Sequence, residues 1–317
     1  MPEFDYCFIL NPAANGGLAG RKWPRLERLL KAADIAHDCY ISEKKGHCIE
    51  LVEAALTAGH TNLVAVGGDG TANEVLNGIF QSPLKNIANI TLSVIPWGTG
   101  NDWASYYRFS PHLEDCVRLL RARSSTLQDI GMVSFVASTG KASKHYFLNC
   151  VGTGFDSYLL EKMSTTRGRR LRYLFYALKC AFDFKATQLG LHVNGETFER
   201  HALMLEICLG KYAGAGMQFA PEAIADDGLF DILFINDLST LQIFGSLLYL
   251  YNGKIDSHWA VKRWRSGSVS IDAQTKQWFH CDGELIGQLP VRVDILPQTL
   301  RIIAPEGMPG SHFPEGN

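Results

Sequence analysis

A short apolar run that ends in two glycines constrains the fold of this 317-residue chain more than any other feature. Residues 62–66 read NLVAV, which is typical of a buried strand, and residues 67–70 read GGDG. A helical pattern follows at once, with Val75, Leu76 and Ile79 on its buried face. A strand that turns directly into a helix is the repeating unit of a parallel α/β sheet, so this segment predicts that fold for its surroundings.

The same alternation runs through the first 126 residues and predicts an α/β domain around a parallel sheet. After a small-residue loop over 13–20, one helix is expected to begin near Trp23-Pro24, and a second helix ends at Gly59. The expected strands are Tyr6–Leu10, His37–Ile41, Asn62–Val66 and Ile90–Ile95.

From about residue 127 the pattern changes to strand-like runs at short spacing, which predicts a mainly β second domain. Asn194-Gly195 is a two-residue hairpin signal between two such runs. Helical patterns over roughly 157–185 and 238–253 interrupt the strands. We therefore expect one domain over 1–126 and a β-rich domain over 127–296.

Composition excludes several classes of protein. The chain has 30 Lys and Arg against 32 Asp and Glu and is 46% hydrophobic, so neither a basic nucleic-acid binder nor a disordered chain is expected. The longest apolar stretch, 241–251, covers about half of the ~20 residues that a spanning helix needs, and the first residues do not resemble a signal peptide. The eight cysteines form no CxxC pair. We expect a cytoplasmic protein with reduced core thiols and no zinc site.

The glycine loop that ends the third strand has the features of a phosphate site. Gly67, Gly68 and Gly70 let the backbone approach a ligand, and the helix that opens near Thr71 presents free N–H groups. A carboxylate repels phosphate unless a cation intervenes, so Asp69 indicates Mg²⁺ coordination or proton abstraction. The simpler alternative is a plain strand-to-helix turn with Asp69 as a helix cap.

A second glycine turn, residues 96–104, follows the fourth strand and reads PWGTGNDWA. The carboxyl ends of parallel strands share one edge of a sheet, so the two turns are expected to form two walls of one crevice. Thr99 and Asn101 could donate hydrogen bonds to a nucleotide, and Asp102 could anchor the Asp69 loop or a metal-bound water. A capped helix start is again the simpler alternative.

Five motifs together resemble the diacylglycerol kinase catalytic domain family, which includes bacterial diacylglycerol kinases and the sphingosine and ceramide kinases. The two glycine turns, which read GGDGTANEV and PWGTGNDWA, carry most of the likeness. An opening NPAANGG loop and two motifs of the β-rich half complete it. Trp97 and Gly100 depart from the family pattern in the second turn. In sequence order the motifs begin at Asn11, Gly67, Pro96, Ala220 and Asp282.

The resemblance implies a fold, a cofactor and a set of nucleotide contacts. The first domain would be similar to NAD kinase and phosphofructokinase, the second would be sandwich-like, and ATP would bind in the cleft between them. The C-terminal tail from about 297 would return to the first domain. The residues expected to bind the nucleotide are Asn11, Gly67, Gly68, Gly70, Thr71, Glu74, Thr99 and Asn101.

The resemblance also implies a catalytic centre at the triplet Asp282-Gly283-Glu284, which by itself would pass for a common β-turn. Bacterial relatives use this aspartate, with the glutamate nearby, whereas sphingosine kinases are described with the glycine-loop aspartate as base. Asp69 and Asp282 therefore both remain candidates. We favour Asp282 as the base, with Asp69 and Asp102 organising Mg²⁺ and water.

Two further residues near these motifs receive interpretations. Asp227, with the Leu229 carbonyl, resembles a structural Mg²⁺ site that supports the catalytic turn, although an acidic segment such as 222–237 is more often a solvated face. His280 is interpreted as a packed strand residue in preference to a base, and Cys281 as core.

The function that these motifs predict is ATP- and Mg²⁺-dependent phosphorylation of a lipid hydroxyl at a membrane surface, as in phospholipid biosynthesis. A diacylglycerol-like lipid is the preferred acceptor, and a sphingoid base is a second candidate. A homodimer is an open alternative for the oligomeric state. The alternatives are a soluble-substrate kinase similar to NAD kinase and a non-catalytic lipid-binding homologue. The segment 161–185, with local charge +5 and interleaved aromatics, could dock on anionic lipid, or pack on the β domain with a solvated basic edge.

Overall fold

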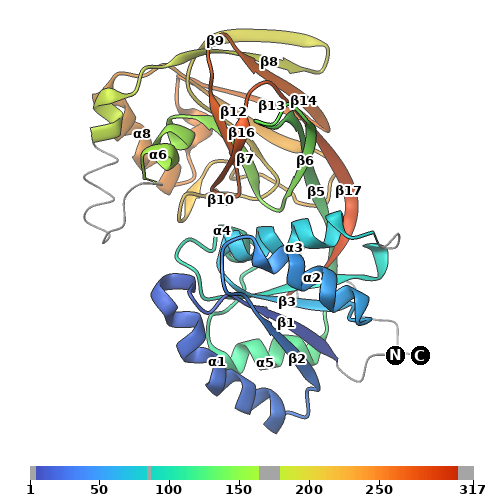
Figure 1. Cartoon of the computed structure of the whole chain (residues 1–317). Helices are drawn as coiled ribbons and strands as arrows, with labels where there is room; N and C mark the ends of the chain where they lie inside the picture. Colours follow the sequence, from blue (N-terminus) through green and yellow to red (C-terminus); the bar gives the residue numbers. More distant parts are fainter. Residues whose placement is uncertain (1–4, 84–86, 164–178, 306–317) are drawn as a thin grey trace. The chain divides into compact units, whose positions relative to one another are not determined.

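The structure is a computed structural model that describes residues 5–83, 87–163 and 179–305. The chain folds into two compact units (Figure 1). Unit 1 comprises Met1–Ile130 with Pro297–Asn317, and unit 2 comprises Gly131–Leu296. The tail after 297 is thus part of the first unit.

Unit 1 is an α/β unit around a parallel sheet, as the alternating pattern predicts. Its strands are β1 (Tyr6–Leu10), β2 (His37–Ile41), β3 (Asn62–Gly67) and β4 (Thr91–Pro96). They lie in the order β4-β3-β1-β2, and the end of β17 (Val291–Ile303) adds a parallel strand beside β4. The long strand β5 (Ser125–Val136) leads out of this unit.

Helices cover both faces of this sheet. One core cluster joins α1 (Ala14–Ala32) and α5 (Leu113–Ala122) to alternate residues of β1, with Phe8 and Leu26 fully buried. Figure 1 shows α2 (His47–Thr57) and α3 (Asp69–Gln81) on the opposite face. The short elements are η1 (Ile87–Asn89) and α4 (Asp102–Tyr106). Because β1, β3 and β4 are buried on both faces, their sequences are mainly apolar runs.

The first helix begins earlier than its proline suggests. It starts at Ala14 and encloses Pro24, although Asn15, Gly16 and Gly17 have left-handed backbone angles. The predicted loop over 13–20 is therefore present only in part, because the backbone is non-helical at residues 15–17 but helical from Leu18 onward. Ala19 and Trp23 are buried in the core, and this burial outweighs the hydrogen bond that Pro24 cannot donate.

Unit 2 is β-rich and antiparallel, as the short spacing of its strands predicts. Its central order is β16-β15-β7-β9-β8-β14-β17, and β12 pairs with β9 and β13. Asn194-Gly195 forms the predicted hairpin turn, with φ values of 53° and 81°. The strands are β6 (Ala142–Phe147), β7 (Cys150–Gly154), β8 (Thr187–Val193), β9 (Glu196–Cys208), β10 (Tyr212–Ala213), β11 (Met217–Gln218), β12 (Phe230–Asn236), β13 (Val261–Ser266), β14 (Ser268–Ala273), β15 (Trp278–Cys281) and β16 (Glu284–Gln288).

Two α-helices of unit 2 have defined bounds in the described residues: α6 (Phe155–Met163) and α8 (Thr240–Tyr251). A short turn, η2 (Ile255–Ser257), follows α8. The four arginines of the basic segment, at 167, 169, 170 and 172, lie outside the described residues. No helix within 5–83, 87–163 or 179–305 is long and apolar enough to span a membrane.

Candidate active site

The two glycine turns of unit 1 touch each other through their backbones. Gly68 follows β3 and Gly98 follows β4, and a Cβ on Gly68 would lie 2.8 Å from Gly98 Cα. A Cβ on Gly98 would lie 2.2 Å from Gly68 Cα. Only glycine fits at either position, because any side chain would push two backbones apart. The predicted pairing of the two turns at one sheet edge is therefore present in unit 1.

Side-chain amides hold this pair of turns in shape. Asn101 has a left-handed φ of 58°, accepts a hydrogen bond from Gly98 N at 3.0 Å and donates one to Gly98 O at 3.1 Å. Asn15, from the opening loop, also donates to Gly98 O, at 3.3 Å. Asn101, predicted as a nucleotide ligand, thus closes its own loop, while Thr99 beside it is exposed.

The opening loop contacts the first glycine turn. Asn11 Nδ2 donates to Thr71 Oγ1 at 3.2 Å, and Asn11 Oδ1 accepts from Ala13 N. A Cβ on Gly67 would lie 2.3 Å from Thr71 Oγ1, which explains the glycine there. The structure thus brings Asn11, Gly67 and Thr71 together at the start of α3.

Glu74 makes contacts other than those predicted for it. Its carboxylate accepts backbone hydrogen bonds from Gly46 N at 2.8 Å and Cys48 N at 3.2 Å, at the first turn of α2. A negative charge at a helix N-terminus is favourable. Contact between Glu74 and a nucleotide stays a prediction.

The carboxylates of Asp69 and Asp102 face the same residue. A Cβ on Gly100 would lie 3.0 Å from Asp69 Oδ2 and 3.5 Å from Asp102 Oδ2. Asp69 Oδ1 accepts a hydrogen bond from Trp103 N at 3.3 Å, which ties the first turn to α4. Two carboxylates at such a place are oxygen donors of the kind Mg²⁺ prefers, so these residues fit the ion. Gly100 leaves the room between them that a side chain would fill.

In unit 2, Asp282 and Gly283 form the turn between β15 and β16, and both have positive φ, 48° and 81°. Asp-Gly is the expected sequence for such a turn. The Asp282 carboxylate also accepts three backbone hydrogen bonds from the start of β7 and the two residues before it, and Glu284 begins the next strand. The donors are the N–H groups of Leu148, Asn149 and Cys150, at 2.9, 2.9 and 3.0 Å. Asp282 is thus held in a fixed orientation.

Asp227 lies elsewhere in unit 2. Its carboxylate accepts from Leu229 N at 3.1 Å and forms an ion pair with Arg265, which also lies 3.5 Å from Asp231. The guanidinium supplies the positive charge that a structural Mg²⁺ would bring. The contacts of Asp227 are therefore explained without an ion, and Mg²⁺ binding by Asp227 and Leu229 stays a prediction.

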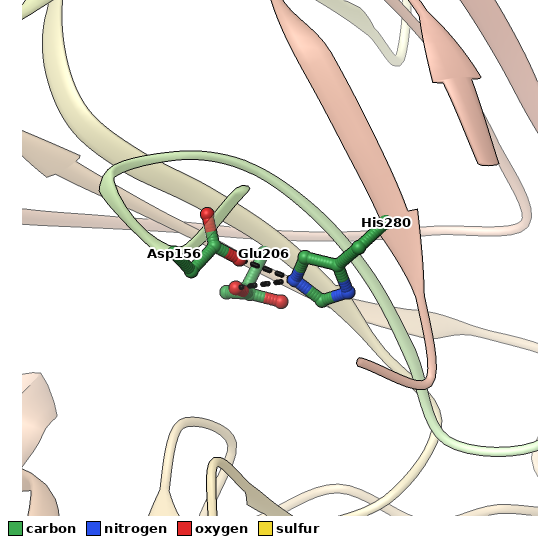
Figure 2. Close-up of side chains that lie close together, drawn as sticks. All are labelled: Asp156, Glu206 and His280. Atoms are coloured by element: carbon green, nitrogen blue, oxygen red, sulfur yellow. Dashed lines mark hydrogen bonds and ion pairs between the residues drawn. The ribbon is translucent and has the colours of Figure 1, made fainter. Parts of the chain in front are cut away.

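A buried cluster of three ionisable side chains was not predicted from the sequence (Figure 2). His280 Nε2 pairs with the Asp156 carboxylate and lies 3.5 Å from Glu206 Oε1. The three come from the start of α6, from β9 and from β15. His280 is packed in its strand, as expected, but its partners were missed. One signal exists: Glu206 is a lone carboxylate inside the apolar run 202–209.

The protonation of this cluster follows from its burial. Burial would lower the pKa of His280, but the charges of Asp156 and Glu206 outweigh it and raise that pKa well above its usual value. Burial alone would raise the pKa of Asp156, but His280 lowers it to about 2. Burial and the charge of Asp156 raise the pKa of Glu206 to about 8. At neutral pH the cluster therefore holds one ion pair and one protonated Glu206.

Comparison with known proteins matches both halves of the chain to family models. Residues 5–133 match the diacylglycerol kinase catalytic domain, and residues 149–304 match the YegS C-terminal NAD kinase beta sandwich-like domain. A Bacillus subtilis protein named as a lipid kinase, YtlR, is 29% identical over 93% of this chain and 98% of its own. A diacylglycerol kinase of Staphylococcus saprophyticus is 25% identical over 94% of both chains.

Solved structures share the fold. A diacylglycerol kinase crystal structure from Bacillus anthracis superposes with a TM-score of 0.71 at 19% identity, over 96% of this chain and 99% of that one. Yeast NADH kinase superposes with a TM-score of 0.52 at 10% identity, over 94% and 82% of the two chains.

The family model of the first half and the named kinase relatives together identify the chain as an ATP-dependent kinase. More narrowly, residues 5–133 match the diacylglycerol kinase catalytic domain family and residues 149–304 match the C-terminal domain of the YegS type, so the two matches together span most of the chain.

Proposed function

We propose that this protein transfers the γ-phosphate of ATP to the hydroxyl of a diacylglycerol-like lipid with the help of Mg²⁺. The observation that carries the proposal is the pair of glycine turns with the carboxylates of Asp69 and Asp102 both beside Gly100. The names of the relatives, a lipid kinase and a diacylglycerol kinase, support a lipid acceptor.

The residues of unit 1 would hold the nucleotide and its ion. Backbone N–H groups at the start of α3 favour phosphate, and Asp69 and Asp102 would hold Mg²⁺, which neutralises charge on the transferring phosphoryl group. Residues 1–130 with 297–317 are therefore assigned to the nucleotide and 131–296 to the lipid.

A carboxylate would take the proton of the acceptor hydroxyl. Asp282 is held by three backbone hydrogen bonds, so most of its acceptor capacity is occupied, while Asp69 accepts from Trp103 N. The occupied oxygens of Asp282 support an alternative arrangement in which Asp69 is the base, Asp102 holds the ion without it, and Asp282 serves to fix the turn that carries Glu284.

Peripheral association with a membrane is part of the proposal, because the acceptor has apolar tails. It is supported by α8, whose solvent-facing side includes Leu241, Leu248 and Tyr249, which are 84%, 68% and 40% exposed. No residue of α8 is charged, and the exposed Trp259 follows it. An exposed apolar face with aromatic residues is typical of a helix that enters the lipid interface.

One assay separates this function from its alternatives. The purified chain is incubated with radiolabelled ATP and Mg²⁺ against diacylglycerol, a sphingoid base, ceramide and NAD in turn. Labelled phosphatidic acid is the expected product. Label on NAD would favour the soluble-substrate kinase, and lipid binding without label on any acceptor would favour the non-catalytic homologue.

A further inference from the structure

The cluster of Asp156, Glu206 and His280 has the composition and spacing of a metal site. The nearest ligand atoms of the three side chains all lie within 4.8 Å of one another. An ion with bonds of about 2.0–2.2 Å to three ligands places those ligand atoms roughly 3 to 4 Å apart. Small rotations of the side chains would therefore complete the geometry.

A second observation points to a missing ligand. Glu206 is 2% exposed, yet its Oε2 has no hydrogen-bond partner. Burying a polar atom without a hydrogen-bond partner costs free energy, and native proteins rarely contain such an atom. Figure 2 shows the Glu206 carboxylate against the His280 ring, on the side that Asp156 approaches.

Charge and access agree with an ion at this place. A dication balances two carboxylates while the imidazole is neutral, which removes the need to bury unbalanced charge. The side chain of Asp156 is 19% exposed, whereas His280 is 6% exposed, so the cluster opens to solvent at Asp156. Three protein ligands and one open position are a common arrangement for a transition metal.

We propose that Asp156, Glu206 and His280 bind a first-row divalent transition-metal ion, such as Zn²⁺ or Mn²⁺, that links β9, β15 and the start of α6. One imidazole and two carboxylates suit these ions better than Mg²⁺ or Ca²⁺, which prefer oxygen ligands alone. His280 lies two residues before Asp282, and its Nδ1 lies 3.4 Å from Gly283 N in the same turn. The ion would therefore stabilise the strand that leads into the Asp282 turn.

The test is metal binding by the full chain without nucleotide. After treatment with EDTA and dialysis, Zn²⁺ or Mn²⁺ is titrated by calorimetry, and one equivalent should bind per chain. Glu206→Gln and His280→Gln should each weaken binding by at least ~100-fold, more than the loss of an outer-shell partner. The matched control is His192→Gln, which removes an exposed imidazole that pairs with Asp272 at 2.6 Å.

Anomalous diffraction from crystals of the wild-type chain with Zn²⁺ locates the ion independently of any variant's folding. A peak among the three side chains, retained in Asp69→Asn, supports the site. A wild-type chain that binds no more ion than Glu206→Gln would overturn it and leave a hydrogen-bonded cluster only. A single peak between Asp69 and Asp102 would overturn it as well, because the bound ion would then belong to the nucleotide site.

Discussion

The glycine turns of unit 1 and the charged cluster of unit 2 are built in opposite ways. In the turns, the backbones of Gly68 and Gly98 touch, and Asn101 folds back on its own loop. In the cluster, three ionisable side chains meet that are at least 50 residues apart in the sequence. A site formed by backbone groups of short turns can be predicted from a sequence motif. A site formed by side chains that are distant in the sequence can be found only once the fold is known.

The largest expected effect that tests this contrast is a loss of turnover. Asp69→Asn should lower kcat by at least ~10²-fold, because the change removes a charge that positions Mg²⁺ or accepts a proton. The melting temperature should change little, since the side-chain oxygen of Asn can still accept the 3.3 Å hydrogen bond from Trp103 N. Steady-state kinetics on the phosphorylated lipid and a thermal melt measure the two quantities.

Asp282→Asn should behave differently. Its carboxylate accepts three backbone hydrogen bonds, and an amide can serve only part of them, so the variant should lose stability by about 1–3 kcal/mol as well as turnover. Asp272→Asn, at an exposed carboxylate of the same unit, is the control. Near-normal turnover in Asp69→Asn would contradict its role, and an unchanged melt in Asp282→Asn would contradict the structural role of its carboxylate.

The second effect is on nucleotide affinity. Gly68→Ala should weaken ATP binding by about tenfold or more, because its Cβ would lie 2.8 Å from the backbone of Gly98 and would move both turns. Gly245→Ala, where a Cβ meets nothing within 4 Å, is the control, and calorimetric titration of ATP is the measurement. If the Gly68 variant binds ATP as the wild type does, the phosphates lie elsewhere.

The fold could be predicted from the sequence because β1, β3 and β4 are mainly apolar runs, and β3 and β4 end in Gly67 and Pro96. The motif residues Asn11, Thr71 and Asn101 could also be predicted, because each lies in a motif that follows a strand. The contacts of other motif residues could not be predicted. Glu74 accepts a hydrogen bond from the N-terminus of α2, and Asp227 pairs with Arg265, only in the folded chain. His280 could be placed in a strand, but its partners lie on two other elements.

The third effect concerns the pH dependence of stability. Glu206 keeps its proton up to a pKa of about 8, whereas an unfolded glutamate loses it near 4.5. The native state therefore binds more protons between these values, so the free energy of unfolding falls as pH rises from 5 to 8. His280, with its raised pKa, acts in the same direction above about pH 6.5. The lowered pKa of Asp156 matters only below about pH 4.

Glu206→Gln should remove most of this slope, roughly 1 kcal/mol per pH unit. Chemical unfolding at pH 5, 6.5 and 8 in the presence of EDTA measures it, with the exposed Glu199→Gln as the control. An equal slope in both variants would mean that Glu206 is ionised in the folded protein.

The smallest effect should come from the surface of α8, which contrasts with exposed apolar residues elsewhere. Leu241→Gln with Leu248→Gln should lower sedimentation with phospholipid vesicles several-fold, since these side chains are 84% and 68% exposed and would bury their area in the lipid interface. Stability should stay within about 0.5 kcal/mol, because neither side chain is in the core. Ile41→Gln, at a residue of β2 that is 51% exposed, is the matched control in unit 1. If the control loses as much vesicle binding as the α8 variant, then membrane association is not specific to α8. Such a result would contradict the assignment of membrane contact to unit 2.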